Sequence, residues 1–282
     1  MRVLVTGATG NVGRPTVDAL RARGHDVVAA VRGDDPGPFD VGVRRAVLDF
    51  RDRSTWDAAL DGVDGLFLLR PPAIADVGAT LNPLVDRAVV RGVTHIVFLS
   101  VVGAGQVKFI PHRTVEDHLR QAGARWTFLR AGFFMQNLST AYRDDLRQES
   151  RLYVPAGAGG VAWVDAVDLG EAAAVAFDRG DTAAGRAWAL TGAEALTFAE
   201  VAVALSEVLG RPVRYEPATL FGYARHLQLR GLPLAQVAVQ AVLHTAIRFG
   251  REGVVDPTLG DVLGRPPTTM RAFLERERAV WA

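Results

Sequence analysis

The 282-residue sequence contains no cysteine, and Lys108 is its one lysine among many arginines. The absence of cysteine excludes disulfide bonds, a thiolate nucleophile and cysteine-ligated metal sites. No stretch reaches the ~20 consecutive apolar residues of a membrane helix, and the start of the chain lacks the pattern of a secretory signal. The six histidines do not have metal-ligand spacing. We therefore expect a cytoplasmic protein without a bound metal.

Neither sign of charge dominates the sequence. It contains 32 Lys and Arg residues against 31 Asp and Glu residues, for a net charge of +1. This balance provides no overall field toward nucleic acid or an anionic membrane. We expect neither of these as a partner, and instead a small-molecule substrate and a monomer or homodimer. With 49% hydrophobic residues, the chain can bury a full core.

The first half of the chain alternates short apolar runs with helical patterns. The runs are nearly unbroken, as in strands buried on both faces of a parallel sheet. They predict strands at 2–7, 25–33, 43–50, 64–72, 93–100 and 125–132. The intervening segments predict helices at 11–24, 54–62, 79–92 and 113–123. This order predicts an α/β fold with a doubly wound (Rossmann) parallel sheet.

The second half of the chain has a different pattern. A helix is expected to begin near Asp168, and a short strand is expected at 186–192. A further helix opens at Thr197, with Glu200 at the spacing of a capping box. The segments after residue 218 are mostly helical in pattern. We expect 1–150 to form the dinucleotide-binding core. We expect 151–282 to complete the sheet and to form a smaller, mostly helical substrate lid over its carboxyl edge.

Three glycines follow the first expected strand, in the stretch VTGATGNVG. Gly7 permits the tight turn out of the strand, Gly10 lets the backbone approach a pyrophosphate, and Gly13 lets the helix pack close to the sheet. The free N–H groups at the start of the helix offer a site for the phosphates. A glycine loop alone is weak evidence, but a strand before it and a helix after it are the context of a dinucleotide site.

Arg32 closes the second expected strand. An acidic residue there would favour NAD, whereas a guanidinium matches the 2′-phosphate of NADP. Asp34 and Asp35 follow directly and weaken this assignment unless their side chains point away. We interpret Arg32 as the contact to the 2′-phosphate and expect NADP(H) as the cofactor.

Further motifs extend along nearly the whole chain: VTGATGNVG, VRG, LDFRDRSTWDAALDGVDGLFLL, HIVFLSVVGA, WTFLRAGFFMQNL, VDAVDLGEAAA and GRPPTTMRAFLERERAVW. Together they resemble the NmrA-like group of atypical short-chain dehydrogenases. Within that group, the sequence is most similar to bacterial NAD(P)H-binding members near the quinone reductases, the azoreductases and the ergot-alkaloid-type imine reductases.

The resemblance implies a cofactor site along the strand ends. It assigns the phosphates to Gly7, Thr9, Gly10, Asn11 and Val12, and the 2′-phosphate to Arg32. It places the adenine beside Asp49 and Phe50, and the ribose beside Leu68, Leu69 and Arg70. It places the nicotinamide beside Ser100, Val101, Ala131, Gly132, Phe133 and Phe134.

The sequence departs from ordinary short-chain dehydrogenases at the catalytic residues. None of its four tyrosines is followed four residues later by a lysine. Members of the NmrA-like group often keep a lysine at the start of the helix before the sixth strand, and here Pro111 and His112 occupy that place. We take His112 as a contact to the nicotinamide ribose or as a proton shuttle. Phe134 is a candidate for stacking on a flat ligand, and Asn137 is a candidate for orienting it.

These features favour an NADPH-dependent reductase that transfers a hydride to a quinone, an enone or an iminium carbon. Such acceptors can take a proton from water, which fits the missing tyrosine–lysine pair. A sensor that binds NADP(H) without turnover fits the missing pair equally well, and an isomerase or cyclase on the same fold is a third possibility. We interpret Tyr223, His226 and His244 in the late helices as structural or solvated residues.

NADPH is expected to bind more tightly than NADH, by about tenfold, because the Arg32 guanidinium can hold the 2′-phosphate with two hydrogen bonds. Fluorescence titration of the purified protein with each nucleotide measures the two affinities. Equal or tighter binding of NADH would contradict the assignment of Arg32.

Overall fold

The computed structural model describes residues 1–33, 39, 42–107, 109–250 and 252–282. These residues form two compact units. Unit 1 comprises Met1–Ala131, Ala166–Leu190 and Thr258–Arg265, and unit 2 comprises Gly132–Asp165, Thr191–Pro257 and Pro266–Ala282. This division differs from the single boundary expected after residue 150. The segments Ala166–Leu190 and Thr258–Arg265 return to unit 1, where they add a strand to its sheet and two helices to one face of the sheet.

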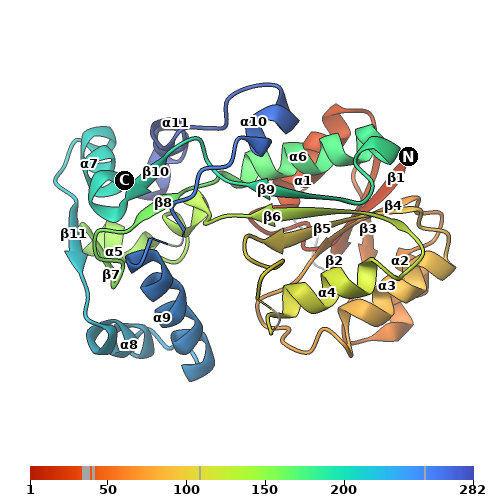
Figure 1. Cartoon of the computed structure of the whole chain (residues 1–282), viewed down its shortest axis with the longest axis horizontal. Helices are drawn as coiled ribbons and strands as arrows, with labels where there is room; N and C mark the ends of the chain where they lie inside the picture. Colours follow the sequence, from red (N-terminus) through yellow and green to blue (C-terminus); the bar gives the residue numbers. More distant parts are fainter. Residues whose placement is uncertain (34–38, 40–41, 108, 251) are drawn as a thin grey trace. The chain divides into compact units, whose positions relative to one another are not determined.

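A seven-stranded sheet forms the centre of unit 1 in the described residues (Figure 1). Its strand order is β3-β2-β1-β4-β5-β6-β9, and all neighbouring strands run parallel. The order reverses beside β1, which confirms the doubly wound sheet. The strands are β1 (Arg2–Val5), β2 (Asp26–Val31), β3 (Arg44–Val47), β4 (Gly65–Leu69), β5 (His95–Val101), β6 (Arg125–Ala131) and β9 (Arg186–Leu190).

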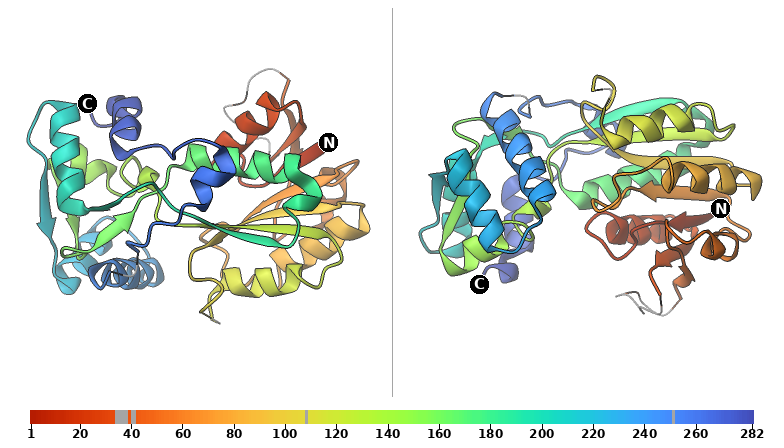
Figure 2. Two further views of the ribbon diagram at one scale, coloured as in Figure 1. Left: turned by 45° about the horizontal axis from the view of Figure 1, so that its top comes forward. Right: turned by 90° about the horizontal axis from the view of Figure 1, so that it is seen from below.

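Helices cover both faces of this sheet, as Figure 1 and the further views of Figure 2 show. One face carries α1 (Gly13–Ala22), α6 (Ala166–Arg179) and α10 (Thr258–Leu263). The other face carries α2 (Trp56–Ala59), α3 (Leu81–Val90) and α4 (Pro111–Leu119). The helix expected at 54–62 is a short turn, η1 (Arg53–Thr55), followed by α2, and the Asp52 carboxylate caps the turn.

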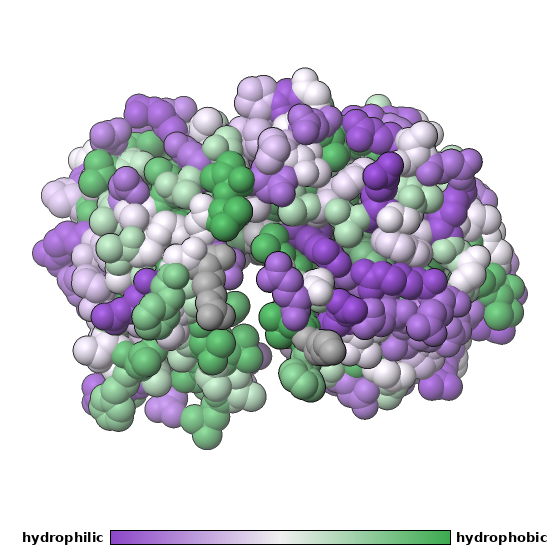
Figure 3. Space-filling view, viewed as in Figure 1, coloured by the Kyte–Doolittle hydropathy of each residue, from purple (hydrophilic) through white to green (hydrophobic). Residues whose placement is uncertain are grey.

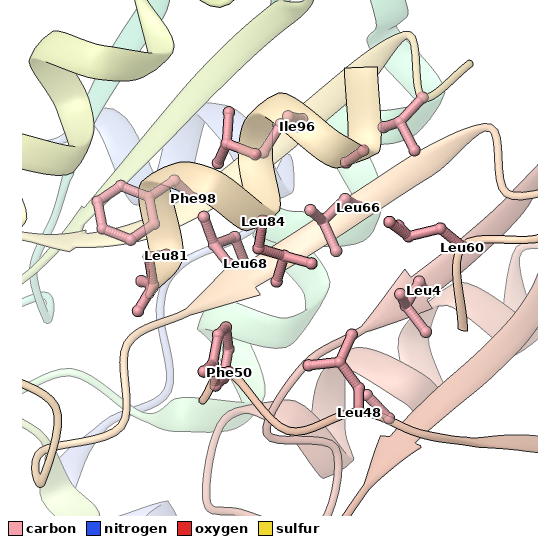
Figure 4. Close-up of a cluster of buried hydrophobic side chains, with 14 of the residues drawn as sticks. Leu4, Leu48, Phe50, Leu60, Leu66, Leu68, Leu81, Leu84, Ile96 and Phe98 are labelled. Atoms are coloured by element: carbon pink, nitrogen blue, oxygen red, sulfur yellow. The ribbon is translucent and has the colours of Figure 1, made fainter. Parts of the chain in front are cut away.

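The core under α2, α3 and α4 contains side chains from the strands and from these helices (Figure 4). Strand residues that alternate with them are buried on the opposite face of the sheet, as Val3, Val5 and Phe67 show. Burial on both faces explains why these strands are nearly continuous apolar runs in the sequence. The core members labelled in Figure 4 are Leu4, Leu48, Phe50, Leu60, Leu66, Leu68, Leu81, Leu84, Ile96 and Phe98.

A glycine that the sequence analysis did not single out allows α1 and α6 to pack closely. At Gly13, which is predicted to let α1 pack close to the sheet, a Cβ would lie 2.0 Å from the carbonyl oxygen of Gly7, in the turn between β1 and α1. A Cβ on Gly170 of α6 would lie 2.6 Å from the carbonyl carbon of Pro15 on α1. Gly170 therefore sets the distance between these two helices.

Unit 2 contains two small sheets that the sequence analysis did not predict. β7 (Arg151–Val154) pairs parallel with β11 (Arg214–Pro217), and β8 (Gly160–Ala162) pairs antiparallel with β10 (Ala195–Thr197). Strands of three or four residues are too short to show a hydrophobic period. The longer elements of unit 2 are helices, which are α5 (Arg143–Gln148), α7 (Phe198–Leu209), α8 (Leu220–Leu229), α9 (Leu234–Arg248) and α11 (Met270–Arg276).

The capping box predicted from Thr197 and Glu200 is confirmed at the start of α7, where each residue bonds the backbone N–H of the other. Gly210 ends the same helix in the left-handed conformation, with φ 68°. None of the described helices is both long and apolar enough to span a membrane.

The substitution Gly170→Ala is expected to lower the free energy of unfolding by about 2 kcal/mol, because the new methyl group would meet the backbone of α1, which cannot move aside without separating the helices. Chemical denaturation measures the change. Gly78→Ala is the matched control, since the atom nearest to its Cβ would be a side-chain oxygen of Asp76 at 3.5 Å. Equal losses in the two variants would contradict this role of Gly170.

Candidate active site

The strand ends of unit 1 bring most of the predicted cofactor residues to one edge. All strands of the sheet are parallel, so their carboxyl ends share that edge, which is where ligands bind in open α/β sheets. The predicted residues at the end of a strand or directly after it are Gly7–Val12 for β1, Arg32 for β2, Asp49 and Phe50 for β3, Leu69 and Arg70 for β4, Ser100 and Val101 for β5, and Ala131 for β6.

The turn between β1 and α1 has the geometry of a phosphate site. Gly7 adopts φ +62°, and the Gly10 N–H donates to the Gly7 carbonyl at 2.9 Å. Thr9, Gly10 and Asn11 are exposed, whereas Val12 is buried and anchors the turn. No side chain caps the start of α1 among the described residues. The backbone N–H groups of this turn thus fit the pyrophosphate of a dinucleotide.

A buried threonine fixes this turn to the neighbouring strand. The Thr6 hydroxyl donates to the Phe67 carbonyl at 3.0 Å and accepts the Leu69 N–H at 2.8 Å. The side chain of Leu69 lies beside Gly7, where a Cβ would come within 3.1 Å of it. The end of β4 and the glycine turn therefore form one surface.

The residues predicted beside the adenosine lie after β2 and β3. Arg32 directly follows β2 and is exposed, and Asp34 and Asp35 lie outside the described residues. One oxygen of the Asp49 carboxylate accepts the Arg51 N–H at 2.8 Å, and the Trp56 indole N–H donates to the Asp49 carbonyl at 2.8 Å. Phe50 is buried in the core (Figure 4), so it supports this loop from the inside.

Ser100 is committed to a buried ion network that the sequence analysis missed. Its hydroxyl donates to Glu116 at 2.7 Å, and Arg130 donates two hydrogen bonds to the same carboxylate at 2.9 and 2.6 Å. Burial opposes ionisation, but the hydrogen bonds from Arg130 and Ser100 hold the pKa of Glu116 below its usual value. No pattern in the sequence distinguishes Glu116 from a solvated helix residue. Its main partner, Arg130, lies on another element, β6.

His112 lies in the first turn of α4 and faces Arg70 from the end of β4. The Arg70 Nε–H donates to His112 Nε2 at 3.4 Å. Burial, reinforced by the charge of Arg70, lowers the pKa of His112 to about 4. The imidazole is neutral at pH 7 and accepts at Nε2, which leaves Nδ1–H as a donor. A hydrogen bond to a ribose hydroxyl fits this state better than a proton shuttle does.

Phe133, Phe134 and Asn137 belong to unit 2, whereas Ala131 ends β6 in unit 1. Phe134 and Asn137 are half-buried. Phe134 forms a β-bridge with Val164, and the N–H that follows it, on Met135, donates to the Val164 carbonyl at 2.9 Å. The structure thus fixes the backbone of this segment within unit 2.

Phe133 belongs to an aromatic cluster centred on His244. The imidazole of His244 is fully buried, and its Nε2 pairs with the Tyr142 hydroxyl at 2.6 Å. Its Nδ1 lies 2.7 Å from the Gln240 carbonyl oxygen, which makes Nδ1 the donor and Nε2 the acceptor from Tyr142. The rings around it are those of Phe133, Tyr142, Phe198 and Tyr223.

The tyrosines of this cluster do not have the pKa of a proton donor. Burial raises the pKa of Tyr142 well above its usual value, and burial likewise raises the pKa of Tyr223. The expectation that Tyr223 and His244 are structural residues fits these contacts. His226 pairs instead with the buried Asp145 at 3.1 Å, and Arg230 donates to the same carboxylate at 2.6 Å.

Exposed apolar side chains of unit 2 concentrate on α8 and α9 and just after α9. Figure 3 shows hydrophobic surface over these helices. The large side chains exposed on α8, on α9 and just after α9 are Leu220, Phe221, Leu229, Leu234, Val239, Val242, Leu243 and Phe249.

Among the described residues, no group of three or more histidines, aspartates or glutamates could hold a metal ion.

The chain is similar to known proteins over nearly its whole length. The NmrA-like family profile matches residues 1–273. The NAD(P)H azoreductase of Xenophilus azovorans is 33% identical over 99% of this chain and 99% of its own. The (4-alkanoyl-5-oxo-2,5-dihydrofuran-3-yl)methyl phosphate reductase of Streptomyces griseus subsp. griseus is 33% identical over 95% of each. The Citrobacter sp. triphenylmethane reductase structure with NADP(H) has a TM-score of 0.84 at 24% identity, covering 98% of this chain and 99% of that one.

The free energy of unfolding is expected to decrease as the pH falls from 6.5 to about 4, because burial lowers the pKa of His244 from 6.5 to about 4 and the unfolded chain takes up its proton first. The slope contributed by this residue is at most about 1.4 kcal/mol per pH unit. Denaturation of the protein and of His244→Gln across this range measures it. Glutamine keeps an acceptor for Tyr142 and does not titrate, so an unchanged slope would rule out a buried neutral His244.

Proposed function

We propose that this chain, which belongs to the NmrA-like family, is an NADPH-dependent reductase that transfers a hydride to an electron-poor small molecule. The row of strand ends in unit 1 carries this proposal, since it combines a glycine turn, an uncapped helix start and Arg32 along one edge. Two full-length relatives at 33% identity are reductases by name, and the first of them uses NAD(P)H.

Different residues of unit 1 bind different parts of the cofactor. The turn at Gly7–Val12 binds the pyrophosphate through backbone N–H groups, and Arg32 binds the 2′-phosphate. The loop at Asp49 borders the adenine. Leu69 and Arg70 border the ribose, while His112 donates its Nδ1–H to a nicotinamide ribose hydroxyl. Val101 and Ala131 line the place of the nicotinamide, with Ser100 supporting it through Glu116.

When bound, NADPH supplies the hydride, and the chain must then provide a route for one proton. The described residues at the strand ends contain no tyrosine with a neighbouring lysine, and His112 is neutral at pH 7 and not an imidazolium acid. Tyr142 is buried, and its raised pKa keeps it protonated. We therefore assign the proton to water. This restricts the acceptor to molecules whose reduced form is a stable anion or a neutral amine.

Quinones, enones and iminium carbons meet this requirement. An azo group and a furanone are the acceptors that the names of the two relatives indicate. Phe134 and Asn137 contribute the stacking ring and the amide that orient the acceptor. A cytoplasmic location, the absence of nucleic acid and membrane partners, the monomeric or dimeric state, and a substrate-lid role for the part of 151–282 outside unit 1 belong to the same proposal.

Purified protein is expected to oxidise NADPH only when a quinone, enone or cyclic iminium is present. Phe134→Ala should lower kcat/KM about tenfold, because the acceptor loses a stacking surface, and should leave NADPH affinity unchanged. The loss of NADPH absorbance measures turnover, and fluorescence titration measures binding. Val90→Ala, which shortens an exposed side chain at the end of α3, is the control and should retain full activity.

The outcome separates the possible functions of the chain. Tight NADPH binding without turnover on any acceptor would contradict the reductase and favour a sensor. Formation of a rearranged product without net NADPH oxidation would favour an isomerase or cyclase.

A further inference from the structure

Arg70 is a partly buried cation without a carboxylate partner in the described part of the chain. Its Nη1 group donates to the backbone carbonyls of Ile74 at 2.5 Å, Pro71 at 3.3 Å and Pro72 at 3.4 Å. Its Nε donates to a neutral imidazole, that of His112. Its Nη2 group has no partner among the described residues. A guanidinium in this setting retains a full positive charge that nearby protein groups do not neutralise.

The start of α4 adds to this positive field. α4 has nine residues, and no side chain caps it within the described residues. His112 is in its first turn and contacts Arg70, so the positive end of the helix dipole and the guanidinium act on the same place. The nearest acidic group along the helix, Glu116, is already neutralised by Arg130 and Arg120.

The anionic groups of the cofactor have other partners. The pyrophosphate belongs to the glycine turn after β1, and the 2′-phosphate belongs to Arg32 after β2. Arg70 and α4 follow β4 and β5, on the other side of β1 from Arg32. This side of the site receives the nicotinamide ribose, whose one phosphate is part of the pyrophosphate that we assign to the glycine turn.

We propose that Arg70, which donates to His112 beside the start of α4, binds an anionic group of the acceptor, such as a sulfonate, phosphate or carboxylate. This inference rests on the proposed reductase function and names its substrate class as electron-poor molecules that carry an acidic substituent. A planar guanidinium with one amino group that has no partner among the described residues can bind such an oxyanion through a charge-assisted hydrogen bond.

The test uses binding and needs no turnover, so it stays valid if reduction is not detected. The protein is saturated with NADP⁺ and titrated by calorimetry with a naphthalenesulfonate and with the matching naphthalenesulfonamide, which has nearly the same shape and no charge. The sulfonate is expected to bind about tenfold more tightly. In Arg70→Gln this preference should disappear while the affinity for the sulfonamide stays constant. Arg70→Lys, which keeps the charge, should retain most of the preference.

Arg51→Gln is the matched control. It removes the same charge, and its guanidinium also donates to the loop after β4, at the Ala73 carbonyl, 3.4 Å away. This variant should keep the preference for the sulfonate. Equal affinity of the unaltered protein for the two probes would overturn the proposal. A loss of NADP⁺ affinity in Arg70→Gln with an unchanged preference would also overturn it, because Arg70 would then serve the cofactor.

Discussion

The hydrogen bonds of Thr6 hold together the part of unit 1 on which the cofactor site depends. The backbone N–H and the hydroxyl of Thr6 both donate to the Phe67 carbonyl, and the hydroxyl also accepts from Leu69. These bonds join the end of β1 to the end of β4, where the order of the sheet reverses. Gly7 turns beside Leu69 at the point where the two strand ends are joined. The turn that we propose for the phosphates and the strand end that we propose for the ribose therefore form one surface.

The positive charge along the same edge depends on which arginines have a carboxylate partner. Arg130 is neutralised by the buried Glu116, so it orders the ends of β5 and β6 and stabilises the ionised carboxylate. Arg70 contacts carbonyls and a neutral imidazole instead. The two arginines differ little in sequence context, yet Arg130 forms a buried ion pair and Arg70 contacts only backbone carbonyls and an imidazole among the described residues. Burial of an acidic partner makes this difference.

Unit 2 shows how a polar group can be buried without becoming reactive. His244 donates to the Gln240 carbonyl and accepts from Tyr142 in a cluster of rings, so each polar atom of the pair is used. Burial keeps the imidazole neutral and the phenol protonated. The cluster also holds Phe133 against Trp163 at 5.0 Å, and the adjacent Phe134 is thereby restricted in position. These buried groups do not change their protonation state near neutral pH.

The sequence by itself determined the parallel sheet of unit 1, the glycine turn and the order of residues along the strand ends, because long apolar runs and local turn chemistry carry those signals. The capping box of Thr197 is equally local. Only the tertiary structure decided that Gly170 sets the α1–α6 contact, that Ser100 serves Glu116, and that Arg70 meets His112. These contacts join residues from separate elements, and the short strands of unit 2 depend on partners distant in the chain. No local pattern encodes either.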